Sequence, residues 1–139
     1  MAGFDLQRFV TAQAPVYAQA LAELRDGRKQ SHWMWFVFPQ IAGLGRSPTA
    51  IRFAIASSGE ARAYLAHDLL GPRLGECTLA VLAHCGRSAQ SIFGPVDAIK
   101  LRSSMTLFEA AQGDAGSMFA DCLDAFFAGA RDPATLARI

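Results

Sequence analysis

The chain has 139 residues, of which 52% are hydrophobic and 18% charged, so we expect one folded domain over 1–139 rather than a disordered chain. The 13 basic and 12 acidic residues give a formal net charge of +1, which argues against bulk nucleic-acid binding. The sequence shows neither a signal peptide nor an apolar run near the roughly 20 residues that span a membrane. We therefore expect a cytoplasmic protein without a membrane segment.

The three cysteines, at positions 77, 85 and 122, are odd in number and widely spaced. This pattern does not predict a disulfide framework. The chain has no CxxC or HxxxH pair, so we expect neither a metal site nor a cofactor. We expect reduced thiols, two of them on apolar helix faces.

The first two predicted helices cover 5–13 and 15–26. Asp5 fits the N-cap of the first, and Pro15 fits the first turn of the second. Gly27 fits the residue that ends the second helix.

The helical signal weakens between residues 27 and 57. The run 33–38 fits either a buried strand or a buried helical turn, and periodicity does not decide between them. A small strand pair near 33–55 is therefore an alternative. The prolines and glycines that follow predict a loop, in which Gly43, Gly45 and Ser47 fit a weak anion-binding turn.

The rest of the chain is predicted to be helical. Ser57 and Glu60 form a capping-box signature, and Pro95 fits a first helical position. A single turn is expected over 88–93. The longer helices are expected over 57–67, 71–86, 95–112 and 115–128, with a short one from 133. The fold class is therefore all-α, a compact orthogonal bundle of six to seven short helices.

The predicted helix 95–112 carries polar residues on the side that should be buried. The side expected to face solvent carries Arg102, Thr106, Glu109 and Gln112. Asp97, Lys100 and Ser104 project from the opposite, apolar side. A charge in a core is costly unless it is paired. Asp97 and Lys100 therefore either form an internal ion pair or line a concave site.

Cationic residues are followed closely by aromatic residues within the run 28–40. Arg28, Lys29, His32, Trp33 and Trp35 lie within eight residues of one another. Cations beside indole rings suit an anionic ligand with a planar group. The alternative is that the rings are core residues and the two cations are solvated.

Two segments carry a resemblance to a known family: 32–40 (HWMWFVFPQ) and 97–108 (DAIKLRSSMTLF). They resemble the bacterial family catalogued as domain of unknown function eighteen-ten, and the resemblance extends over nearly the whole chain. It implies a small helical protein without an established activity, so no catalytic residue carries over. Some members bear a calpastatin label, but calpain inhibitors of that name are disordered repeats, whereas this composition predicts a compact chain.

The leading hypothesis is a pocket between segment 28–40 and helix 95–112 for an anionic small molecule, nucleotide-like or ADP-ribose-like. The candidate ligand-binding residues are Arg28, Lys29, Trp33, Trp35, Gln40, Lys100, Ser103 and Ser104. If the protein is an enzyme, His32 and Asp97 are the acid/base candidates. The alternative is a non-enzymatic interaction module with an exposed aromatic surface and a purely structural polar cluster.

Overall fold

Helices form nearly all the regular structure in the computed structural model, which describes residues 4–113 and 117–139. The described helices are α1 (Gln7–Gln13), α2 (Tyr17–Arg25), α3 (Met34–Val37), α4 (Pro48–Arg52), α5 (Ser58–Ala66), α6 (Leu70–Leu82), α7 (Ala89–Gln112), α8 (Met118–Phe127) and α9 (Pro133–Leu136). The all-α class is confirmed. The expected six to seven helices were too few, because α4 was not predicted and the run that forms α3 was left open between a strand and a helical turn.

Local capping explains several of the helix ends. The Ser57 hydroxyl accepts a hydrogen bond from the Glu60 amide (3.2 Å), as its capping-box position predicts. Gly27 follows α2 with a φ of 68°, which confirms its predicted role at the end of that helix. Two predictions were wrong. Leu6 rather than Asp5 precedes α1, and α2 begins at Tyr17, after Pro15.

The segment between α2 and α5 contains a helical turn and one isolated bridge instead of a strand pair. Residues 34–37 form α3, so the run 33–38 is helical. A single parallel bridge joins Ile41 and Ile55, through hydrogen bonds from the Ile55 amide to Gln40 O and from the Ala42 amide to Ile55 O, both 2.8 Å. The bridge brings the chain entering the 42–47 loop beside the chain leaving α4.

The long helix α7 bends sharply at Gly94, so the predicted turn at 88–93 and helix 95–112 form one bent element. Gly94 has φ 80° and ψ 165°, a conformation that is almost confined to glycine. Pro95 then restarts the helix, where its missing amide hydrogen costs nothing. The bend turns the first part of α7 away from the direction of the second.

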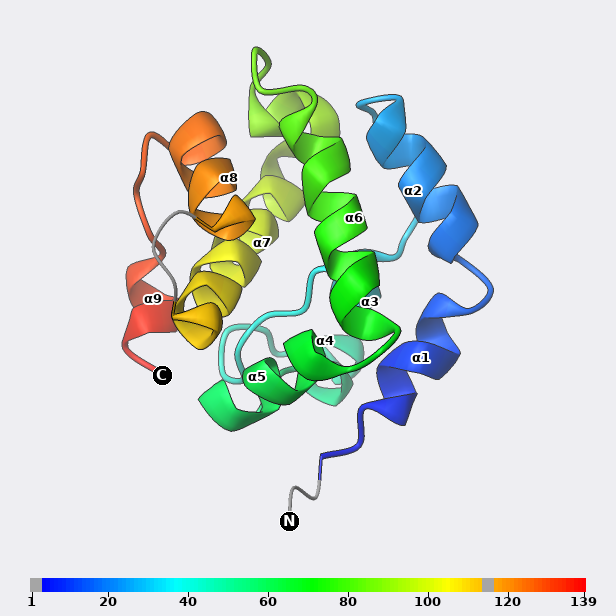
Figure 1. Cartoon of the computed structure of the whole chain (residues 1–139), viewed down its shortest axis with the longest axis vertical. Coiled ribbons are helices and arrows are strands. Elements are labelled where there is room, and N and C mark those ends of the chain that lie inside the picture. The colour runs from blue at the N-terminus through cyan, green and yellow to red at the C-terminus, as the bar shows by residue number, and fades with distance from the viewer. Residues whose placement is uncertain (1–3, 114–116) are drawn as a thin grey trace.

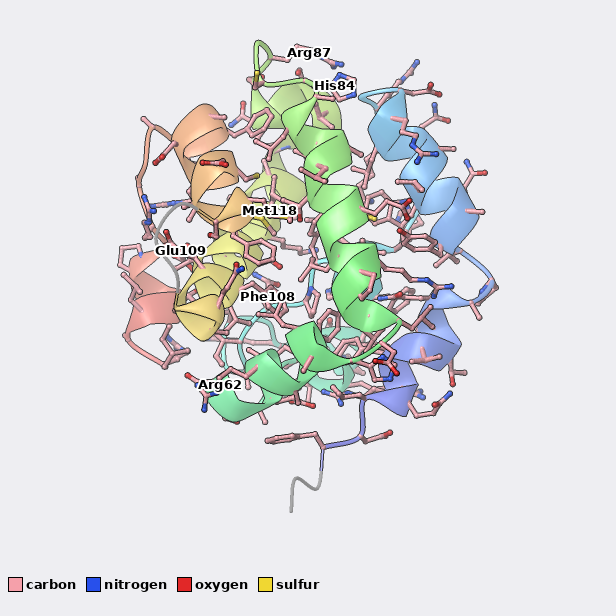
Figure 2. The ribbon with its side chains drawn as sticks, in the orientation of Figure 1. Arg62, His84, Arg87, Phe108, Glu109 and Met118 are labelled. Carbon is pink, nitrogen blue, oxygen red and sulfur yellow. The ribbon has the colours of Figure 1, made fainter. Side chains whose placement is uncertain are left out.

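The core lies where α7 meets α5 and α8, and α6 covers it by contacting α2, α5 and α8 (Figure 1). The Phe108 side chain points into this interior and is fully buried (Figure 2). The rings of Trp33, Tyr64, Phe9 and Phe38 are also almost fully buried. At the far end of α6, the His84 Nε2 atom lies 2.9 Å from Leu24 O, which ties α6 to the end of α2.

The side of α7 that was expected to face solvent is covered by the C-terminal segment. Arg102 donates hydrogen bonds to the carbonyls of Ala130 and Arg131, both at 2.7 Å. Thr106 is fully buried and accepts a hydrogen bond from the Asp132 amide (3.0 Å). The expectation of a solvated face was wrong for Arg102 and Thr106, because residues 130–132 satisfy their polar groups, whereas Gln112 is exposed as expected.

Cys77 and Cys122 are buried and Cys85 is exposed, all three as free thiols. Burial raises the pKa of Cys77 and of Cys122 to about 12. The burial of two of the three thiols agrees with the prediction that two cysteines lie on apolar helix faces. In the described part of the chain, no helix is long and apolar enough to span a bilayer.

Candidate functional site

The two segments that the sequence singled out are in direct contact. The Lys29 Nζ atom lies 2.9 Å from Asp97 Oδ2, and the Lys29 amide donates to Ile92 O at 2.8 Å. Phe38 also packs edge-on against Phe93, with ring centroids 6.1 Å apart. The 28–40 segment is therefore fixed against α7 by an ion pair, a backbone hydrogen bond and an aromatic contact.

Asp97 is shared by two lysines. Its other carboxylate oxygen, Oδ1, lies 3.2 Å from the Lys100 Nζ atom, one helical turn away. The side chains of Lys29, Asp97 and Lys100 are 7%, 19% and 21% exposed, so the cluster is largely withdrawn from water. The internal i,i+3 pair that the sequence predicted as one explanation is present, and Lys29 extends it across the two segments.

Lys100 also lies over the ring of Trp35, with Nζ 4.4 Å from the ring centroid. The Asp97 carboxylate and the Trp35 ring together hold the ammonium group in place. Trp35 is only partly buried and reaches this position because it lies on the helical turn α3. The ammonium is thus presented at the surface by a carboxylate and an aromatic ring, each of which attracts a cation.

A pocket of about 400 Å³ opens beside this contact, and we call it the Trp35 pocket. It is lined by Trp35, Gln40, Leu44, Gly45, Arg46, Ser47, Ala50, Val96, Ile99 and Lys100. Its volume is within the range of small-molecule sites, about 300–1,000 Å³. Three of the candidate ligand-binding residues are on its walls: Trp35, Gln40 and Lys100.

The lining of the Trp35 pocket is cationic. Among the described residues that line it, Lys100 and Arg46 are the charged ones and none carries a carboxylate. Arg46 is exposed and forms no ion pair with any other residue in the described ranges. Ser47 adds a hydroxyl, although that oxygen already accepts the Ala50 amide as the N-cap of α4 (3.1 Å). A negative ligand group fits this lining best.

The buried carboxylate of Glu23 holds the loop that carries Lys29. Its oxygens accept hydrogen bonds from the Gln30 amide (2.8 Å), the Ser31 amide (3.0 Å) and the Trp33 indole (2.9 Å). Burial alone would raise the pKa of Glu23, but hydrogen bonds, the strongest from the Ser31 hydroxyl, lower it to about 2. Glu23 therefore stays ionised and positions the loop.

Trp33 has no exposed surface, and its indole N–H is used by Glu23. Its ring packs against Phe38 in the core. Trp33 is therefore a core residue, and its assignment as a ligand-stacking residue was wrong in this geometry. The alternative that the aromatic run is packing applies fully to Trp33 and partly to Trp35, which packs against the core but also lines the Trp35 pocket.

Three other candidates lie outside the Trp35 pocket. Lys29 forms an ion pair with Asp97, and its Nζ atom lies 5.0 Å from the centroid of the Trp33 ring, so both interactions are within the protein. Arg28 and His32 are exposed in the loop, and neither is on the pocket wall. The structure therefore brings Asp97 to the pocket's edge through Lys100 but does not place His32 there.

Ser103 and Ser104 are buried within the helical packing of α7. The Ser103 hydroxyl donates to Asp132 Oδ2 (2.8 Å), so it joins α7 to the C-terminal segment instead of the pocket. The Ser104 hydroxyl is fully buried and has no hydrogen-bond partner among the described residues. Neither side chain reaches a ligand in this arrangement.

An exposed aromatic surface, which the alternative interaction module requires, is absent from residues 4–113 and 117–139. The exposed large hydrophobic side chains there are aliphatic: Ile51, Leu69, Leu79, Val96, Ile99, Leu136 and Ile139. Within the same ranges, no group of three histidine, cysteine, aspartate or glutamate residues is placed to hold a metal ion.

Comparison with known proteins places this architecture in a family. Residues 3–139 match the family model described as "Protein of unknown function (DUF1810)". The chain belongs to this family. The DUF1810 description assigns no activity, so the functional argument rests on the geometry of the pocket.

One solved structure is closely similar throughout its length. It is the crystal structure of the conserved hypothetical protein Rv1873 from Mycobacterium tuberculosis, 57% identical in sequence, with a TM-score of 0.94. The match covers 98% of this chain and 96% of that one. No match was found among the curated proteins. The DUF1810 fold described above is therefore shared over the whole length of a bacterial relative.

Sequence reasoning overlooked Arg46, Val96, Ile99 and Glu23. Arg46 lies between the Gly45 and Ser47 of the predicted anion-binding turn, so its position in that turn was the available signal. Val96 and Ile99 were not considered, because apolar residues in a helix do not by themselves reveal that they are exposed. Glu23 gave no signal, because its partners lie up to ten residues away around a loop.

Proposed function

We propose that this protein binds a small anionic organic molecule, nucleotide-like or ADP-ribose-like, in the Trp35 pocket. The observation that carries the proposal is a small-molecule-sized pocket whose charged lining residues are Lys100 and Arg46. Both cations present N–H donors, and the guanidinium fork of Arg46 suits a phosphate or a carboxylate. The free thiols support a reducing, cytoplasmic environment for this function.

Each wall of the pocket contributes a different interaction. Lys100 is pre-oriented by Asp97 and Trp35, so less side-chain entropy is lost when it meets an anion. Arg46 and Ser47 come from the loop on the opposite wall. Because the Lys100 ammonium covers the Trp35 ring, the remainder of the ligand lies against the aliphatic residues Val96 and Ile99.

The proposal is binding rather than catalysis. The Asp97 carboxylate is already occupied by two ammonium groups, those of Lys29 and Lys100. His32 is not on the pocket wall. The described lining of the Trp35 pocket therefore supports ligand capture by Lys100 and Arg46.

Calorimetric titration with phosphate, pyrophosphate, AMP, ADP and ADP-ribose tests the proposal. At least one of these probes is expected to bind, and Lys100→Met is expected to raise its Kd by about tenfold or more, since a hydrogen bond to a charged group contributes about 1.5–3 kcal/mol. Arg46→Ala should weaken the same probe. Arg62→Ala, at an exposed arginine on α5 outside the pocket, is the matched control.

Two results would count against anion binding here. One is the absence of heat and of thermal stabilisation with all five probes. The other is binding that Lys100→Met and Arg62→Ala weaken equally, since that would reflect overall charge rather than this pocket.

A further inference from the structure

A second pocket, of about 430 Å³, lies on the other side of α7, and we call it the α7–α8 pocket. Its apolar walls are Pro95, Ala98 and Ile99 from α7 and Phe126 and Phe127 from α8. It lies just beyond the Gly94 bend, where the two parts of α7 diverge and the end of α8 packs beside them. The bend and two phenylalanine rings thus form an apolar hollow at the surface.

The charged residues of the α7–α8 pocket are already used by the protein itself. Arg102 donates to two backbone carbonyls of the C-terminal segment. Asp132 accepts hydrogen bonds from Ser103 (2.8 Å) and Thr135 (2.6 Å), and its pKa is lowered chiefly by these bonds against the opposing effect of burial. What remains available for recognition is the apolar lining.

The two pockets share one wall, the side chain of Ile99. Ile99 is 68% exposed, and Val96, one turn earlier on the same face of α7, is 66% exposed. Large aliphatic side chains left this open beside two hollows are typical of a surface that a ligand covers. We call Val96 and Ile99 the aliphatic ridge. The cationic Trp35 pocket lies on one side of it and the apolar α7–α8 pocket on the other.

We propose that the ligand of the Trp35 pocket is an amphipathic phosphate ester whose apolar part crosses Ile99 into the α7–α8 pocket. The inference rests on the proposed function, because the anionic head is the group that Lys100 and Arg46 hold. The apolar part covers Val96 and Ile99 and contacts Phe126 and Phe127. The anionic head matches the cationic Trp35 pocket, and the apolar tail matches the apolar α7–α8 pocket.

A series of probes with one head and a growing tail tests this directly: inorganic phosphate, then ethyl, butyl, hexyl and octyl phosphate below their aggregation concentrations. Affinity is expected to rise with chain length, by up to about fourfold for each fully buried methylene. Ile99→Gln should flatten this dependence. Leu79→Gln, the same type of change at an exposed leucine of α6 outside both pockets, should preserve it.

Amide chemical shifts locate the tail. Octyl phosphate should shift the resonances of Gln90 and Phe127 in the α7–α8 pocket, whereas ethyl phosphate should shift only those around the Trp35 pocket. Phosphate binding without chain-length dependence would overturn the two-pocket ligand and leave the anion site standing. Chain-length dependence without shifts at Gln90 and Phe127 would also overturn it. Failure of every alkyl phosphate, with AMP, ADP or ADP-ribose still binding, would overturn the two-pocket ligand alone, whereas failure of all of these probes would remove the proposed function itself.

Discussion

At the scale of single residues, Asp97 connects the two segments of the candidate site. It joins Lys29 from the loop to Lys100 on its own helix, and Lys100 in turn lies over Trp35. Lys29 is the most buried of these charges, at 7% exposed, and a buried ammonium is stable only beside a counter-charge. Asp97 thus stabilises the fold and positions the pocket's lysine at the same time.

Asp97→Asn is therefore expected to destabilise the protein. The asparagine leaves two lysines facing each other without a counter-charge, and we expect a loss of about 1–3 kcal/mol in the free energy of unfolding. Urea denaturation measures it. Asp68→Asn, at an exposed carboxylate, should change stability by less than about 0.5 kcal/mol. Equal effects of the two substitutions would mean that the lysine pairing contributes nothing to stability.

Glu23 has the clearest pH signature. Its pKa is lowered to about 2 in the folded chain, from an ordinary value of 4.5. The unfolded chain therefore binds a proton at this residue before the folded chain does. The resulting stabilisation is complete above about pH 5 and is lost as the pH falls towards about 2.

The unfolding free energy of the wild type should accordingly fall more steeply with acid than that of Glu23→Gln, which has no proton to gain there. Between about pH 5 and about pH 2, the wild type is expected to lose about 3 kcal/mol more unfolding free energy than Glu23→Gln does. Urea titrations at several pH values measure it. Asp121→Asn, at an exposed carboxylate, should keep the wild-type slope. Parallel curves for wild type and Glu23→Gln would contradict the proposed role of this carboxylate.

At the scale of elements, the bend in α7 shapes both pockets. Gly94 adopts a φ of 80°, and an added Cβ there would meet no atom within 4 Å. Any cost of a larger residue therefore comes from the backbone conformation and not from crowding. A substitution at Gly94 therefore tests the backbone conformation of the bend without a change in packing.

Gly94→Ala is expected to lower the free energy of unfolding by about 1–3 kcal/mol, because alanine strongly disfavours this region of φ and ψ. Gly86→Ala is the matched control: its Cβ also meets open space, and its φ is not positive. That change should stay within about 0.5 kcal/mol. Denaturant unfolding of the two variants measures both changes. If Gly94→Ala left the free energy of unfolding unchanged, the bend would not depend on glycine.

The same helix shows where a periodic pattern misleads. A 3.6-residue period correctly identifies α7 as a helix, but it assigned Thr106 and Arg102 to solvent. Both are hydrogen-bonded to residues 130–132, which are 26 or more positions later in the chain. A polar face predicts solvent only when no later segment supplies matching donors and acceptors.

At the scale of the whole molecule, most of the described helices contact α7 or its neighbours, so the chain is expected to unfold as one unit. Tryptophan fluorescence reports on Trp33 and Trp35 near α3, whereas far-ultraviolet circular dichroism reports on all helices. The two signals should give the same urea midpoint in a single transition. Separate midpoints would divide the chain into independently stable parts and contradict the single domain predicted for 1–139.

The sequence by itself determined the helical class and several element boundaries, because these depend on local chemistry. The Ser57 cap and the glycine after α2 are set by neighbours a few residues away. The helical period also indicated the apolar faces that carry the two buried cysteines. The sequence also determined that segment 28–40 and helix 95–112 carry complementary polar groups.

Only the tertiary structure decided which members of those groups face a ligand. Trp33 and Trp35 are two residues apart and chemically identical, yet Glu23 holds one in the core and Lys100 covers the other at the pocket. Burial of a polar or aromatic residue depends on partners brought together from distant positions, and no local period encodes them. For the same reason the aliphatic ridge at Val96 and Ile99, with a hollow on each side, emerges only once α7, α8 and the 42–47 loop are assembled.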